Sequence, residues 1–148
     1  VPEGTGGRRE TQGDMEKMRI FVDTNILVDY FSGRRKDGVA EKIMKLGRSD
    51  YYEMCTSMIS ANNVVYLKKC YREGFSPKDV SAVVRILPST PEDWDFACVG
   101  TLKDFEDDLQ LACAIHAGCS VILSRDHHFK DSPMPVYGPD EFLELSTK

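Results

Sequence analysis

Apolar residues follow two different spacings along this chain. Short runs rich in β-branched and aromatic residues predict strands at 19–22, 52–56, 85–87, 120–123 and 135–137. Between these runs, apolar residues recur every three or four positions, which predicts helices over about 26–31, 36–46, 58–72, 77–85, 91–99 and from 139 onward. One more helix is predicted to run to residue 117 from a capping box formed by Thr101 and Asp104.

The predicted strands alternate with the predicted helices, and several strands are almost continuously apolar. Such strands are typical of a parallel sheet that helices cover on both faces. The predicted fold class is therefore α/β, a three-layer α/β/α sandwich with a mainly parallel sheet of about four to five strands. A chain of 148 residues has the size of one domain, so we expect a flexible polar tail at 1–17 and a single domain at 18–148.

Composition excludes some classes of protein. With 41% hydrophobic and 29% charged residues, the sequence is typical of a soluble globular protein. No apolar run is long enough to cross a bilayer, and none follows the N-terminal residues as an export signal would require. We therefore expect a cytoplasmic protein without membrane contact. The five cysteines include no CxxC pair, and we expect them to be reduced thiols of the core.

The formal net charge of −5 argues against a uniformly basic surface for nucleic acid. A polyanionic substrate would need local basic groups. The chain offers two main candidates, one at Arg34, Arg35 and Lys36 and one at Lys68, Lys69 and Arg72. Solvated helix faces are the alternative explanation for each group.

Carboxylates stand where an open parallel sheet forms its ligand sites, after the carboxyl ends of strands. Asp23 directly follows the first predicted strand, and Asp126 follows the strand at 120–123. Asp104, Asp107 and Asp108 lie at the start of a helix whose face continues into apolar residues. Inward-facing carboxylates with no basic partner in that helix repel one another unless a cation neutralises them, and this predicts bound Mg²⁺ or Mn²⁺.

Several of these polar residues have a structural alternative. Asp104 equally suits the role of a helix cap, and Asp126 that of a turn residue. Asp107 and Asp108 differ by about one hundred degrees around the helix, which the sequence does not resolve. We expect Asp29 and Asp37 to be surface acids. No HExxH or paired Cys/His spacing is present, so no ligand role is assigned to His116, His127 or His128.

Three of these segments resemble motifs of a known family. Residues 20–30 (IFVDTNILVDY) resemble the opening of PIN domains, and residues 104–114 (DFEDDLQLACA) resemble their third acidic motif. Residues 124–126 (SRD), with Phe129 after them, resemble the fourth. The motifs occur in the family's order over about residues 18–140, and the alternation of strands and helices agrees with the family's fold.

PIN domains are metal-dependent ribonucleases, and many are toxins of bacterial toxin–antitoxin pairs. The resemblance implies that Mg²⁺ or Mn²⁺ is bound by three catalytic carboxylates, Asp23, Asp107 and Asp126, with Asp104 as an outer ligand. Because Asp108 takes a position that the family usually gives to a small residue, the resemblance favours Asp107.

The resemblance also implies roles for residues around the metal. Groups that orient the carboxylates would be Thr24, Asn25, Asn63 and Ser124. Residues that contact RNA would be Arg34, Arg35, Lys68 and Arg125. The implied partners are an RNA substrate, an antitoxin protein and a second copy of the chain in a homodimer.

The helix after the second strand departs from the family's pattern. PIN domains commonly supply a glutamate there, whereas this chain has Asn62 and Asn63, and alignment on the following Val64-Val65-Tyr66 places Asn63 at that position. A neutral amide contributes no charge, so the affinity for a metal ion would be lower. Some PIN domains of the subgroup that this sequence most resembles share the amide.

The predicted activity is a Mg²⁺- or Mn²⁺-dependent endoribonuclease. An alternative is a catalytically weak PIN domain that binds RNA or a protein, for which Asn63 and the acidic net charge are the relevant features. A lesser alternative is a phosphatase of the haloacid dehalogenase type, which also has an aspartate after its first strand. That chemistry requires a second acid two residues later, where this chain has Asn25.

Overall fold

The computed structural model describes residues 16–67, 73–102, 104–125, 129 and 131–147. Within these ranges one sheet contains five strands, which are β2 (Met18–Val22), β3 (Tyr52–Ser57), β4 (Arg85–Leu87), β5 (Val121–Leu123) and β6 (Val136–Tyr137). Their order across the sheet is β4-β3-β2-β5-β6, and every neighbouring pair is parallel. The predicted α/β class with a parallel sheet is confirmed.

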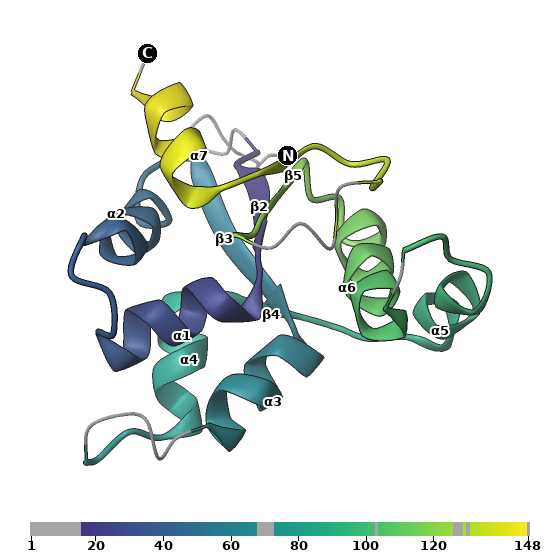
Figure 1. Cartoon of the computed structure of the whole chain (residues 1–148), viewed down its shortest axis with the longest axis horizontal. Coiled ribbons are helices and arrows are strands. Elements are labelled where there is room, and N and C mark those ends of the chain that lie inside the picture. Colours follow the sequence, from purple (N-terminus) through teal and green to yellow (C-terminus); the bar gives the residue numbers. More distant parts are fainter. Residues whose placement is uncertain (1–15, 68–72, 103, 126–128, 130, 148) are drawn as a thin grey trace, which may run out of the picture.

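Helices cover both faces of this sheet (Figure 1). Those on one face, around the larger core, are α1 (Thr24–Ser32), α2 (Val39–Leu46), α3 (Met58–Tyr66), α4 (Pro77–Val83) and α7 (Pro139–Ser146). On the other face lie α5 (Pro91–Cys98) and α6 (Phe105–His116), which pack against each other. The predicted three-layer arrangement is therefore confirmed.

The central strand β2 contributes to both cores. Ile20 and Val22 point into the core beneath α1 and α2, while Phe21 between them points into the core beneath α6. All three side chains are fully buried. Because successive side chains of a strand alternate between faces, a strand covered on both sides must be apolar throughout, which explains the unbroken run in the sequence.

The order of the strands brings β5 next to β2. From β2 the chain proceeds to β3 and β4 on one side and then returns to place β5 on the other side. Val22 and Leu123 are paired in register, so the residues that follow them leave the sheet side by side. Ligand sites of open parallel sheets form at such a reversal of strand order.

Helix starts differ from the predictions where a local cap decides them. The helix predicted from 36 begins at Val39, because Gly38 has φ 71° and the Asp37 side chain accepts the Val39 N–H. The capping box predicted at Thr101 is wrong. Asp104 itself is the cap of α6, since its carboxylate accepts the Glu106 N–H at 2.8 Å.

Other predicted boundaries moved or fall outside the described residues. The helix predicted to reach 85 ends at Val83, because Val84 is extended and leads into β4. The helix predicted for 58–72 ends at Tyr66, and its last predicted part, 68–72, lies outside the described residues. The same holds for positions 1–15 of the predicted tail.

The described cysteines agree with the predicted core thiols except at one position. Cys55, Cys113 and Cys119 are buried and free, whereas Cys98 is exposed at the end of α5, so the prediction is wrong for Cys98. Burial raises the pKa of the Cys113 thiol to about 12. Cys70 lies outside the described residues.

Across the described ranges, we find no helix with the length and apolar character needed to span a membrane.

Candidate functional site

Asp23 joins the end of β2 to the start of α1. It is the N-cap of α1, with an extended backbone, and its Oδ1 accepts the Thr24 N–H at 2.8 Å. Its Oδ2 accepts the Ser124 hydroxyl at 2.8 Å and the Asn25 amide at 3.4 Å. The side chain is only 6% exposed. Donors from α1 and from the residue that follows β5 thus fix the orientation of a nearly buried carboxylate.

A cavity of about 450 Å³ opens beside Asp23. We call it the acid cleft and define it by six of its lining residues, Asp23, Arg34, Asn63, Asp104, Asp107 and Gln110. They come from the start of α1 and the loop after it, from α3 and from the first turns of α6. The cleft therefore collects predicted site residues from three separate segments of the chain.

The structure separates Asp107 from Asp108. Both side chains are buried, at 8% and 3% exposed, but Asp107 lines the acid cleft and Asp108 does not. Asp108 instead accepts the Leu102 N–H at 3.3 Å and lies against Gly100 in the loop between α5 and α6. Asp108 is therefore satisfied within the protein interior, outside the lining of the cleft.

A chain of hydroxyl groups connects the three helices around the cleft. Thr24 Oγ1 donates to Ser60 Oγ at 2.9 Å, and Ser60 Oγ donates to Gln110 Oε1 at 2.8 Å. Ser60 and Gln110 are almost fully buried, and neither was predicted from the sequence. The available signal was helical spacing, because Ser60 precedes Asn63 by one turn and Gln110 follows Asp107 by one turn.

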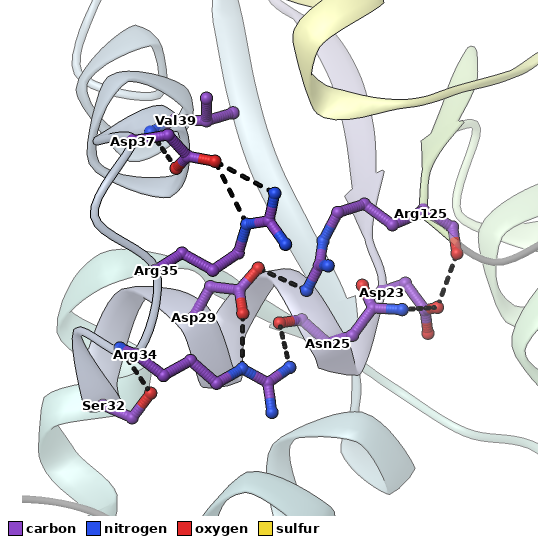
Figure 2. A network of polar contacts seen from close by, with 10 residues as sticks. Asp23, Asn25, Asp29, Ser32, Arg34, Arg35, Asp37, Val39 and Arg125 are labelled. Carbon is purple, nitrogen blue, oxygen red and sulfur yellow. Dashed lines mark hydrogen bonds and ion pairs between the residues drawn. The ribbon is translucent and has the colours of Figure 1, made fainter.

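Asp29 is not the surface acid that the sequence predicts. Its side chain is 4% exposed and lies on the inner face of α1, one turn after buried Ile26. Arg34 Nε donates to its Oδ1 at 2.6 Å, and Arg125 Nη2 donates to its Oδ2 at 2.5 Å (Figure 2). A carboxylate can be buried at this position because two guanidinium groups neutralise it.

Arg35 has a different environment from Arg34. It pairs with Asp37, and both side chains are exposed, at 44% and 39%. The Val39 N–H, with Arg35 beside it, holds the pKa of the Asp37 carboxyl below its usual value. Asp37 is the surface acid that was predicted, and Arg35 is absent from the lining of the acid cleft.

The other predicted site residues are placed as follows. Asn63 is half-buried in α3 and lines the cleft, and Asp104 both caps α6 and lines the cleft. Asp126 and Lys68 lie outside the described residues, as do His127 and His128.

The donor atoms of the cleft fit a hard divalent cation. Its acidic and amide side chains offer oxygen atoms, and neither histidine nor cysteine lines it among the described residues. Within the described ranges, no three His, Cys, Asp or Glu side chains form a complete metal-binding group. Asp23 and Asp107 are the two buried carboxylates among the described residues that line the cleft.

Comparisons with known proteins agree on one family. A family model described as PIN domain matches residues 19–128. Ribonuclease VapC1 of Aquifex aeolicus (strain VF5) is 29% identical over 139 residues, which cover 88% of this chain and 96% of that protein.

Solved structures share the fold at lower identity. A toxin–antitoxin complex from Klebsiella pneumoniae contains a chain with a TM-score of 0.65 and 22% identity, covering 81% of this chain and 97% of that one. VapC20 of Mycobacterium tuberculosis, described as a sarcin-ricin loop cleaving toxin, has a TM-score of 0.57 and 20% identity over 78% of this chain and 95% of its own.

Proposed function

This chain belongs to the PIN domain family, and on that basis we propose that it is a divalent-metal-dependent endoribonuclease that cuts RNA in the acid cleft. The catalytic carboxylates would be Asp23, Asp107 and Asp126. The name of the Aquifex relative, a ribonuclease that matches almost the full length of both chains, supports this activity.

One observation carries the proposal. Asp23 and Asp107 come from segments far apart in the sequence, are both nearly buried, and line the same cavity at the carboxyl edge of the sheet. Burying two carboxylates beside the same cavity is costly unless a cation occupies it during function. Asp108 differs from Asp107 in its position, because it lies outside the cleft lining and accepts the Leu102 N–H.

The proposed reaction is hydrolysis of a phosphodiester. A bound Mg²⁺ or Mn²⁺ ion would lower the pKa of the attacking water and offset charge on the phosphate. Water attacks phosphorus in line, the bond to the 3′ oxygen breaks, and a proton passes to that oxygen, leaving a 5′-phosphate and a 3′-hydroxyl. Ser124 and Thr24 hold the Asp23 carboxylate in place, and no protein nucleophile is required.

We further propose an antitoxin as protein partner and a homodimer as the assembled state. The first proposal is supported by the fold shared with a chain of the Klebsiella toxin–antitoxin complex. Light scattering of the purified chain tests the homodimer.

The activity is tested with purified protein, Mn²⁺, and both single-stranded and structured RNA. Asp23→Asn and Asp107→Asn should each abolish cleavage that the unaltered chain performs. Arg85→Ala serves as the control, because Arg85 pairs with Glu53 at the surface and lies outside the cleft lining. The proposal fails if both Asn variants cleave as fast as the unaltered protein.

A second candidate function is a PIN domain that binds RNA with little catalysis. The position of Asn63 in the cleft favours it, because the family commonly places a charged glutamate there. Calorimetric titration separates the two functions. RNA binding without any Mg²⁺ or Mn²⁺ binding near millimolar concentrations would select the binding module. Membership of the PIN domain family gives the phosphatase alternative no support.

A further inference from the structure

The buried carboxylate of Asp29 holds two arginines from distant parts of the chain. Arg34 follows α1, and Arg125 follows β5, and each donates to a different oxygen of Asp29 (Figure 2). Asp29 is 4% exposed, whereas the side chains of Arg34 and Arg125 are 50% and 28% exposed. Two cations on one buried anion leave a surplus positive charge, and half of the Arg34 side chain remains open to solvent.

The guanidinium of Arg34 has donors to spare. Its Nε is used by Asp29, and Nη2 makes a long contact of 3.5 Å with the Asn25 carbonyl oxygen. Its Nη1 has no hydrogen-bond partner among the residues that the structure describes. Since a guanidinium carries five N–H groups in a fixed plane, Arg34 can bind a second oxyanion while it stays bound to Asp29.

Arg34 is placed so that its free N–H donors can contact a ligand in the acid cleft. Its side chain lines the acid cleft, and it is the one cation among the described residues that do so. The same lining includes the carboxylates of Asp23, Asp104, Glu106 and Asp107, which repel a nucleic acid strand. A phosphate that enters the cleft therefore finds one fixed positive side chain, at the α1 side of the opening.

A comparison with the neighbouring Arg35 shows how Asp29 affects the position of Arg34. Arg35 pairs with the exposed carboxylate of Asp37 and is absent from the cleft lining. Both arginines follow α1 and carry the same charge, but the partner of Arg34 is buried in the fold. An arginine that is already held in its bound orientation loses less side-chain entropy when it binds a ligand.

We propose that Asp29 is a positioning residue, whose carboxylate holds Arg34 at the rim of the acid cleft so that its guanidinium binds a phosphate of the RNA other than the one that is cut. This inference rests on the proposed function for the identity of the ligand. The Asp29 carboxylate also binds Arg125, which directly follows Ser124. Ser124 in turn donates to Asp23, so Asp29 contacts both Arg34 at the rim and the segment that orients Asp23.

The first experiment measures binding of a labelled single-stranded RNA to the full chain carrying Asp107→Asn, at several salt concentrations. In this background Arg34→Ala should weaken binding about five- to tenfold and reduce the slope of log K against log salt by about 0.7, the value for one lost phosphate contact on a single strand. The matched control is Arg85→Ala, because Arg85 is also paired with a carboxylate and 54% exposed. Equal changes in the two variants would overturn the role of Arg34.

The second experiment tests Asp29 through its coupling to Arg34. In a chain that already carries Asp29→Asn, Arg34→Ala should lower the affinity for RNA by less than about twofold, because the Arg34 side chain is no longer held in place. An undiminished five- to tenfold effect in that background would show that Asp29 has no positioning role. Arg34→Lys should recover part of the salt slope, since lysine binds phosphate as a point charge.

Folding is controlled by circular dichroism. If Asp29→Asn does not fold, the background becomes Asp29→Asn with Arg125→Gln, which removes one positive charge together with the negative one. Cleavage by the unaltered chain is measured separately. If Asp29 and Arg34 are coupled in RNA binding but the unaltered chain does not cleave RNA, the proposed nuclease is rejected and the positioning role is kept. If the chain cleaves RNA but the two residues are not coupled, the nuclease is kept and the positioning role is rejected.

Discussion

Asp107 and Asp108 are neighbours on α6 and carry the same charge, and both are almost completely buried, but they face different regions of the molecule. Asp107 lines the acid cleft, where carboxylate and amide side chains from three segments meet. Asp108 packs against the loop between α5 and α6 and accepts a backbone N–H from Leu102. Burial alone therefore does not identify a functional carboxylate, and what each oxygen faces separates the two roles.

The largest expected effect is on catalysis at the cleft side. Asp107→Asn should lower Mn²⁺-dependent RNA cleavage by at least about 100-fold, because it removes a charged ligand from the proposed ion. Without added metal, its melting temperature should stay within about 2 °C of that of the unaltered protein. Asp108→Asn is the matched variant and should keep most of the cleavage activity per folded molecule. The reverse ranking of the two variants would remove Asp107 from the site.

The next effect is on stability at the interior side. In Gly100→Ala the new Cβ would lie 2.2 Å from Asp108 Cγ, so one of the two must move. We expect the free energy of unfolding in urea to fall by roughly 1–3 kcal/mol, with cleavage per folded molecule unchanged. Adding Asp108→Ala removes the clash but leaves the Leu102 N–H without its acceptor. The double variant should be more stable than the sum of the two single losses, and strict additivity would contradict the contact.

Stabilisation by Mn²⁺ should depend on Asp107 at the cleft but not on Asp108 in the interior. At a Mn²⁺ concentration ten times its dissociation constant, the ion should stabilise the unaltered chain by about 1.4 kcal/mol, seen as a higher melting temperature. Asp108→Asn should keep this gain and Asp107→Asn should lose most of it. Removal of the ion with EDTA should reverse the gain. A gain that survives in Asp107→Asn would place the ion elsewhere.

The smallest effect concerns Asn63. Restoring the family's usual acid with Asn63→Glu should tighten Mn²⁺ binding several-fold, because a charge replaces a neutral amide at the cleft wall. Asn62→Glu adds the same charge to an exposed neighbour on α3 and is the control. Isothermal titration calorimetry of both variants measures the difference. Equal affinities would mean that residue 63 does not face the ion.

The fold was predictable because its signals are local and strong. Unbroken apolar runs and helical spacing specify strands and helices without knowledge of distant contacts, and their alternation leads to a parallel sheet. The first residues of α2 and α6 were harder to predict from the sequence. They depend on a single side chain or glycine conformation, at Asp37, Gly38 and Asp104.

The candidate site was predictable only where a motif or a strand end marked it, as for Asp23. Helical spacing alone does not choose between Asp107 and Asp108, because the choice depends on the rotation of α6. The resemblance to PIN domains favoured Asp107, and Asp107 lines the cleft. The burial of Asp29 depends on Arg125, which lies 96 residues further along the chain. Ser60 and Gln110 meet across 50 residues, so no local pattern reports their contact.

The position of β5 beside β2 has a consequence for the order of events during synthesis. The Ser124 hydroxyl reaches Asp23 across 101 residues, and the Asp23 N–H is bonded to the Leu123 carbonyl oxygen. A ribosome-bound chain that ends before β5 has neither contact, whereas the donors of Thr24 and Asn25 to the Asp23 carboxylate are already present. Long-range strand pairing also forms late, since it closes a large loop. About a hundred codons are therefore translated after Asp23 before the residues that complete its side of the cleft are made.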